Sequence, residues 1–257
     1  MAEARIPLIE TVDLKKYFKV GDKSYLHAVD GINMKVYPGE TIGVVGESGC
    51  GKSTLGRTIL RLIEPTSGQI LYNGEDITKL NARQMKRMRQ EMQIIFQDPY
   101  ASLDPRKSVI EIIAEYMIIN KTLPTKREIF NRAAHLMDVV GLARRYATAY
   151  PHELDGGRRQ RIGIARALSV NPKFIVCDEP VSALDVSIQA QILNLLMDLQ
   201  DEMGLTYMFV THDLSVVKHI SNNIVVMYLG QCLEFASSDE LFASPVHPYT
   251  KALLSAI

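Results

Sequence analysis

Residues 46–53 read Gly46-Glu47-Ser48-Gly49-Cys50-Gly51-Lys52-Ser53 and decide the fold class of this chain. They match the pattern G-x-x-x-x-G-K-[ST] at every fixed position. A short apolar run, Thr41 to Val45, leads into them and has the length of a buried strand. The apolar residues that follow have helical spacing: Leu55, Ile59, Leu62 and Ile63. Strand, glycine-rich loop and helix in this order predict a phosphate-binding loop (P-loop).

The chemistry of a P-loop requires these residue types. Glycines allow backbone N–H groups to turn inward around phosphate oxygens, and the helix that starts at Lys52 directs its positive end toward them. Lys52 is expected to reach the terminal phosphates of ATP, and the Ser53 hydroxyl to ligate Mg²⁺. The alternative is a glycine-rich turn without a ligand, which the flanking strand and helix disfavour. The predicted nucleotide-binding residues here are Gly46, Glu47, Ser48, Gly49, Cys50, Gly51, Lys52, Ser53 and Thr54.

A second motif narrows the reaction, because a P-loop alone also occurs in GTPases and small-molecule kinases. The apolar run Phe174–Cys177 ends in two adjacent acids, Asp178 and Glu179. Asp178 can complete the Mg²⁺ site, and Glu179 can polarise the attacking water in phosphoryl transfer. A purely structural pair is the weaker interpretation, since adjacent carboxylates without a cation repel each other.

Composition limits the other classes. The 257 residues carry 29 Lys+Arg against 29 Asp+Glu, so the net charge is zero, whereas a nucleic-acid-binding protein normally has a basic surplus. No apolar run reaches the roughly 18–20 residues of a membrane-spanning helix, so any membrane attachment is expected through partners. The N-terminal residues 1–5 lack the apolar core of a signal peptide. The three cysteines, Cys50, Cys177 and Cys232, fit a reducing cytoplasm, the last two as packing residues.

The order of apolar patterns predicts an α/β protein. Strand patterns occur at residues 29–36, 69–72, 206–210 and 224–228, and a long amphipathic helix at residues 188–203. Strands that alternate with helices indicate a parallel sheet covered on both faces. Residues 108–140 read as helix instead, which predicts a helical insertion between the strand-forming parts.

Six motifs then follow one another in the order typical of one family. They are the P-loop, Gln97 in Phe96–Pro99, the segment Leu154–Gln160, the pair Asp178-Glu179, Asp185 at the end of Ser182–Asp185, and His212 in Thr211–Asp213. Over nearly its whole length the chain therefore resembles the ATP-binding cassette (ABC) ATPases. The resemblance implies one P-loop NTPase domain over residues 1–257, with a mostly parallel central sheet, an N-terminal antiparallel β subdomain and a helical subdomain near residues 98–165.

The resemblance also implies residue roles. Gln97 contacts Mg²⁺ or the attacking water, His212 contacts the γ-phosphate, and Asp185 lies across a dimer interface. Tyr17 stacks on adenine, with Phe18 as the nearby competitor. Two such domains pack head to tail, so that the segment containing Asp155, Gly156 and Gly157 completes the site of the opposite chain.

Within the family the chain is similar to the oligopeptide and dipeptide importer branch. Three segments carry this closer resemblance: Gln97–Arg106, Pro180–Ser187 and His247–Leu254. It implies a peripheral protein at the cytoplasmic face of the membrane, with a second ATPase subunit (identical or different), two transmembrane permease subunits and, indirectly, an extracytoplasmic substrate-binding protein. Nickel or oligosaccharide importers of the same branch remain alternatives, as does a soluble ABC ATPase outside transport. An exporter or a non-catalytic cassette fits the motifs less well.

Two residues depart from the family pattern, and a third raises a question of reactivity. The family usually has Ser where this chain has Asp155, and Gln where it has Arg158. An ionised Asp155 can only accept hydrogen bonds, so we expect two unequal ATP sites in a heterodimer, unless the substitution is harmless or Arg158 offsets it. Cys50 lies near a helix N-terminus, which favours the thiolate, and it is expected to react with maleimides.

Overall fold

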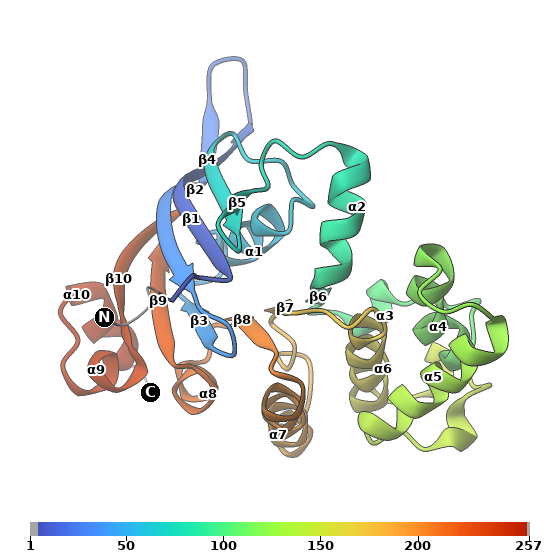
Figure 1. The fold of residues 1–257 in the computed structure, drawn as a ribbon. Coiled ribbons are helices and arrows are strands. Elements are labelled where there is room, and N and C mark those ends of the chain that lie inside the picture. Colours follow the sequence, from blue (N-terminus) through green and yellow to red (C-terminus); the bar gives the residue numbers. More distant parts are fainter. Residues whose placement is uncertain (1–4, 256–257) are drawn as a thin grey trace.

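The computed structural model describes residues 5–255 and contains two sheets (Figure 1). The larger sheet has six strands in the order β10-β9-β3-β8-β7-β6. Its strands are β3 (Thr41–Val45), β6 (Met92–Ile95), β7 (Phe174–Asp178), β8 (Thr206–Val210), β9 (Asn223–Tyr228) and β10 (Gln231–Ser237). All neighbours pair in parallel except β10, which runs antiparallel to β9. β3, β7 and β8 are buried along their whole length, which explains their continuous apolar sequences.

The smaller sheet is antiparallel and has the order β2-β1-β4-β5. Its strands are β1 (Ile9–Lys19), β2 (Tyr25–Val36), β4 (Ser67–Tyr72) and β5 (Glu75–Asp76). Helix α1 (Lys52–Ile59) lies between the two sheets and contacts β1 and β2 on one side and β7 and β8 on the other. One apolar cluster joins both sheets through this helix, so the P-loop that precedes it starts from a rigid base.

Helices cover the remaining faces (Figure 1). α7 (Val186–Met203) and α8 (Leu214–Ile220) lie on the face of the large sheet away from α1. α9 (Ser238–Ala243) and α10 (Pro248–Leu254) lie beside β10, and α2 (Ala82–Glu91) leads into β6. Among residues 5–255 no helix is both long and apolar enough to cross a membrane.

The other helices form a group at one end of the molecule. They are α3 (Pro99–Ser102), α4 (Val109–Asn120), α5 (Lys126–Val139) and α6 (Gly156–Leu168), with the 3-10 turns η1 (Arg144–Tyr146) and η2 (Pro151–Glu153) between the last two. α4, α5 and α6 pack on one another through a common apolar cluster. The boundary at residue 165 expected for a helical subdomain falls within α6.

The structure confirms the predicted fold class and corrects two helices. The continuous helical pattern over residues 108–140 is broken, because Lys121 takes a left-handed conformation (φ 51°) that ends α4, and Thr125 caps α5. The helix after the P-loop ends at Ile59, so Leu62 and Ile63 lie outside it. There Arg61 has φ 49°, and its guanidinium donates to the carbonyls of Ile77 and Leu80.

Candidate nucleotide site

The predicted catalytic segments meet at one edge of the large sheet. The P-loop follows β3, Thr211–Asp213 follows β8, Asp178-Glu179 ends β7, and Gln97 follows β6. These strands are neighbours in the order β3-β8-β7-β6 and run parallel, so their carboxyl ends lie side by side. Ligands in open α/β sheets bind at this edge. Four motifs that are far apart in the sequence therefore form one site.

The P-loop wraps around the ammonium group of Lys52. Lys52 Nζ donates to the carbonyl oxygens of Gly46 and Glu47, each at 2.8 Å, and the side chain is only 4% exposed. Gly51 has φ 109°, and a Cβ there would lie 1.9 Å from the carbonyl oxygen of Ala28. Only glycine fits this close passage next to β2. The loop thus holds a cation in its centre, as phosphate binding requires.

Ser53 and Asp178, the two residues predicted to bind Mg²⁺, lie side by side and are called the metal corner below. Ser53 Oγ donates to Asp178 Oδ1 at 2.5 Å, and Asp178 is 1% exposed. Arg57, one helical turn after Ser53, pairs with Asp178 Oδ2 at 3.0 Å. The two oxygens suit a hard cation such as Mg²⁺, which usually takes few protein ligands and completes its shell with phosphates and water. Within residues 5–255 no cluster of three or more His, Cys, Asp or Glu side chains is found.

Glu179 lies at the centre of the catalytic contacts. Its Oε2 accepts a hydrogen bond from Gln97 Nε2 at 2.8 Å and lies 3.5 Å from His212 Nδ1. The Glu179 backbone is left-handed, with φ 47°, a conformation that costs energy in a non-glycine residue and clusters at functional sites. The carboxylate therefore faces the P-loop side, with Gln97 and His212 from the two neighbouring strands against it.

A cavity of about 710 Å³ joins these groups. Its lining includes Ser48, Gly49 and Gly51–Thr54 from the P-loop segment, with Gln97, Glu179, His212 and a mostly apolar wall. Of the other predicted residues nearby, Gly46, Glu47, Cys50 and Asp178 are not part of the lining. The wall is formed by Phe18, Leu26, His27, Ala28, Leu229 and Gly230. Polar groups at one end and apolar groups at the other match the phosphate and base ends of a nucleotide.

Of the two aromatic candidates for adenine, Phe18 lines the cavity and Tyr17 does not. The Tyr17 ring instead stacks on His27, with ring centroids 3.8 Å apart. Its hydroxyl donates to Asp30, and this hydrogen bond raises the pKa of Tyr17. In this structure Phe18 is therefore the aromatic candidate that borders the cavity.

The remaining predicted residues form a separate surface. Asp155, Gly156, Gly157 and Asp185 do not line the cavity. A Cβ on Gly156 would meet Leu184 at 3.0 Å, and one on Gly157 would meet Ile188 at 2.7 Å, so the two segments lie against each other. Asp155 caps α6 by accepting from Arg158 N, and Asp185 is exposed. This surface, Leu154–Gln160 with Leu184–Ile188, is called the signature face below.

Cys50 corrects an expectation. The thiol is 5% exposed, and burial raises its pKa despite Lys52 Nζ at 3.9 Å. Desolvation disfavours the thiolate and outweighs the nearby positive charge of Lys52. Cys177 is fully buried and Cys232 partly buried, as expected of packing residues.

Two contributors were missed in the sequence. Arg57 is the fifth residue after Lys52, and helical periodicity from Ser53 could have placed it over the metal corner. His27 lines the cavity from β2, and its place opposite Tyr17 depends on the pairing of β1 with β2. A single sequence carries no signal for that register.

Residues 29–182 match the ABC transporter family. The chain belongs to that family. It is an ATPase of the cassette type. Two curated relatives from Bacillus subtilis (strain 168) are the oligopeptide transport ATP-binding proteins OppF and AppF. OppF is 55% identical over 97% of this chain and 82% of its own length. AppF is 52% identical over 97% of this chain and 78% of its own length.

Solved structures agree with this cassette fold. The ATP-binding cassette MJ0796, a dimer in a post-hydrolysis state bound to ADP and Pi, matches with a TM-score of 0.82 and 28% identity. The match covers 90% of this chain and 98% of that one. CbiO1 from Clostridium perfringens, part of the transporter complex cbiONQ, matches with a TM-score of 0.81 and 30% identity over 93% and 91% of the two chains.

Proposed function

We propose that this cassette is one ATPase subunit of an importer of oligopeptides or dipeptides, held at the cytoplasmic face of the membrane by two permease subunits. An extracytoplasmic binding protein would deliver the peptide. The observation that carries the peptide assignment is the 55% identity with OppF over 97% of the chain. The site geometry supports the ATPase part of the proposal independently.

In this proposal, different residues at the site bind the phosphates, hold Mg²⁺ and activate the attacking water. Lys52 would exchange its loop carbonyls for phosphate oxygens, which it holds as a point charge. Ser53 and Asp178, with Gln97 from the other side, would hold Mg²⁺, which when bound neutralises phosphate charge. Glu179 would accept the proton of the attacking water, while His212 contacts the γ-phosphate. A base in this position is worth about 10²–10⁴-fold in rate.

The position of the signature face supports a site shared with a second cassette. Its predicted residues are not part of the cavity lining in their own chain, which favours a role at the nucleotide of another subunit. We infer a head-to-tail dimer in which each ATP lies between one P-loop and the opposite signature face. Closure on ATP and opening after hydrolysis would supply the mechanical stroke.

A groove between α2 and α4 would receive a short helix of the permease. The groove has a volume of about 490 Å³, and its apolar lining includes Met92, Phe96, Tyr116 and Ile119. On α4, next to the groove, Ile118 is 43% exposed. A groove with an apolar lining suits the apolar face of an amphipathic helix.

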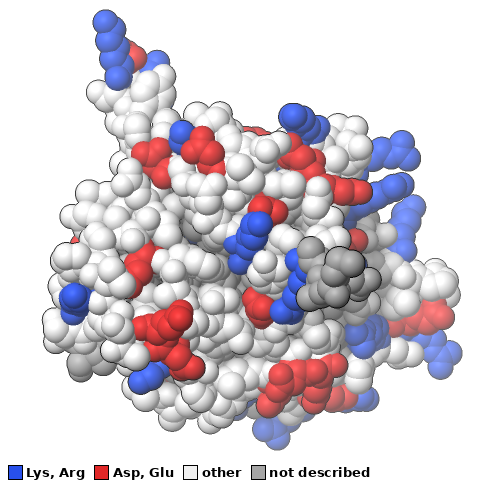
Figure 2. All heavy atoms as spheres, turned by 60° about the vertical axis from the view of Figure 1, so that its left-hand side comes forward, with Lys and Arg blue, Asp and Glu red and all other residues white. Residues whose placement is uncertain are grey.

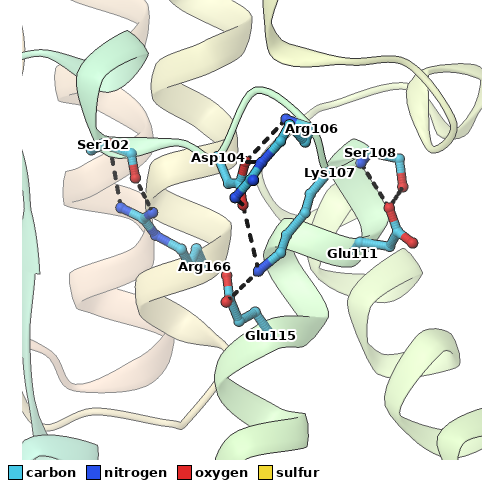
Figure 3. Close-up of polar contacts among 8 residues, drawn as sticks. All are labelled: Ser102, Asp104, Arg106, Lys107, Ser108, Glu111, Glu115 and Arg166. Atoms are coloured by element: carbon cyan, nitrogen blue, oxygen red, sulfur yellow. Dashed lines mark hydrogen bonds and ion pairs between the residues drawn. The ribbon is translucent and has the colours of Figure 1, made fainter.

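Hydrogen bonds and ion pairs hold residues 102–115, which connect α3 to α4 (Figure 3). Arg166 of α6 donates to the Ser102 carbonyl at 2.6 Å, at the end of α3. Lys107 lies 2.5 Å from Glu115 of α4 and 3.9 Å from Asp104. A shift of the permease helix against α4 would therefore be transmitted toward Gln97 and Glu179.

The chain carries no net charge, and its surface is mixed in sign. Figure 2 shows basic and acidic side chains interspersed on the face that it presents, which is the left-hand side of Figure 1 turned forward. The basic side chains Arg83, Lys86, Arg87 and Arg89 lie exposed on α2.

Transport in cells tests the peptide assignment. Deletion of the chain should abolish uptake of labelled di- or oligopeptides, and re-expression of the unchanged chain should restore it. Nickel and oligosaccharide uptake serve as comparisons. Unaffected peptide uptake with loss of nickel or oligosaccharide uptake would contradict the assignment.

A further inference from the structure

The segment His247–Leu254 includes α10 and reaches the P-loop. The backbone N–H of Glu47 donates to the hydroxyl of Tyr249 at 3.1 Å, across 202 residues of sequence. The carbonyl of the same peptide unit, that of Gly46, accepts from Lys52 Nζ at 2.8 Å. The peptide plane at the first bend of the P-loop is thus held from both ends.

Tyr249 is itself held in place. Its ring packs against that of Tyr228, with centroids 4.7 Å apart, at the end of β9. The chain before it is fixed by Glu234 of β10, whose carboxylate accepts from the backbone N–H groups of Val246 and His247 at 2.8 and 3.0 Å. The hydroxyl therefore meets Glu47 from a rigid support.

The C-terminal helix also shares a core with the strand that precedes the P-loop. Tyr249, Leu253 and Leu254 pack against an apolar cluster that contains Val45, the residue directly before Gly46. Movement of α10 would therefore act on both the base of the loop and its first peptide plane.

We propose that Tyr249 is a positioning residue for the P-loop, which it preorganises for phosphate binding by fixing the Gly46–Glu47 peptide. When Lys52 turns to the phosphates, Tyr249 becomes the remaining side chain that holds this peptide. A loop restricted in the free protein loses less conformational entropy on binding, so the hydroxyl strengthens nucleotide affinity rather than chemistry. The inference rests on the proposed nucleotide site.

The test is Tyr249→Phe in the full chain, because Phe keeps the ring packing and removes only the hydroxyl. Titration with MgADP should show a dissociation constant about three- to tenfold higher, because the freed peptide plane must be ordered on binding. The KM for MgATP should rise by a similar factor, with kcat changed less than about twofold. The thermal midpoint without nucleotide should fall by no more than about 4 °C, the effect of one lost neutral hydrogen bond.

Two further variants separate the possible failures. Tyr228→Phe removes a hydroxyl from the other ring of the pair and should bind MgADP like the parent. Lys52→Ala should lose MgADP binding. Normal MgADP binding by Tyr249→Phe together with loss in Lys52→Ala would overturn the positioning role alone. Normal binding by Lys52→Ala would overturn the nucleotide site and the positioning role with it. A lower thermal midpoint with an unchanged KM would make Tyr249 a purely structural residue.

Discussion

Asp155 and Arg158 form an ion pair across the first turn of α6, with 2.5 Å between Oδ2 and Nη1. The Arg158 guanidinium also lies over the Tyr146 ring, 4.9 Å from its centroid. In this structure Arg158 therefore pairs with Asp155 and partly offsets its charge. Both side chains are about half exposed, and pairs of this kind are weak.

The substitution at Asp155 predicts unequal ATP sites. Family members usually place a Ser here to donate to the γ-phosphate, and an acid about 4 Å from a phosphate oxygen would cost on the order of 1–4 kcal/mol. In a complex whose own site is disabled by Glu179→Gln, the remaining hydrolysis belongs to the partner's site. Adding Asp155→Ser should raise that residual rate about fivefold or more.

Asp138→Ser is the matched control, since Asp138 pairs with Arg144 at 2.5 Å outside the signature face. It should leave the residual rate unchanged. An equal or lower rate with Asp155→Ser would show that the acid is harmless or useful at the shared site.

Lys52→Ala should weaken MgATP binding by at least about tenfold, because a charge-assisted contact to the terminal phosphates disappears. Fluorescence titration of the purified chain measures the change. Lys173→Ala removes an exposed lysine paired with Glu91 and is expected to bind normally. Tight binding by the Lys52 variant would place the nucleotide elsewhere.

ATP hydrolysis by the isolated chain should rise more steeply than linearly with protein concentration, because each site needs the signature face of a second molecule. Steady-state assays over a wide concentration range, with the oligomeric state followed in parallel, provide the measurement. A strictly linear dependence in a protein shown to be monomeric would argue against a shared site.

Cys50 should react slowly with maleimides at neutral pH. Burial raises the pKa of this thiol, so the reactive thiolate is scarce below the raised value, and the rate should keep increasing beyond pH of about 8.5, where a free cysteine levels off. MgATP should protect it, since the residue lies in the loop that the nucleotide covers. Mass spectrometry of labelled peptides, with Cys50→Ala as the control, resolves the site. Rapid labelling at pH 7, unaffected by MgATP, would count against this placement.

The sequence predicts the core of the fold well because its central strands are continuous apolar runs. β3 and β8 begin and end at the predicted residues, and the P-loop, acidic pair and Gln97 converge because parallel strands share one carboxyl edge. The ends of helices were less predictable. Arg61, just after α1, makes long-range contacts to the carbonyls of Ile77 and Leu80. The periodicity of apolar residues carries no information on such contacts.

Contacts between distant segments were also beyond the sequence. The hydrogen bond from Glu47 to Tyr249 depends on where α10 lies beside β10. The choice of Phe18 over Tyr17 as the residue lining the cavity depends on which face of β1 is turned to the P-loop. The raised pKa of Cys50 depends on burial by neighbouring segments, which local position in a P-loop does not reveal.

The most direct test of the central claim is Glu179→Gln in the assembled transporter. The variant keeps the contacts of Lys52, Ser53 and Asp178, so ATP should still bind and hold the two cassettes closed. Hydrolysis at its own site should fall about 10²–10⁴-fold with loss of the base, and peptide uptake should stop with it. Measured together, retained ATP binding with abolished hydrolysis and uptake is the predicted result. Full turnover, with all sites in the assembly counted, would contradict the assignment of Glu179 as the base.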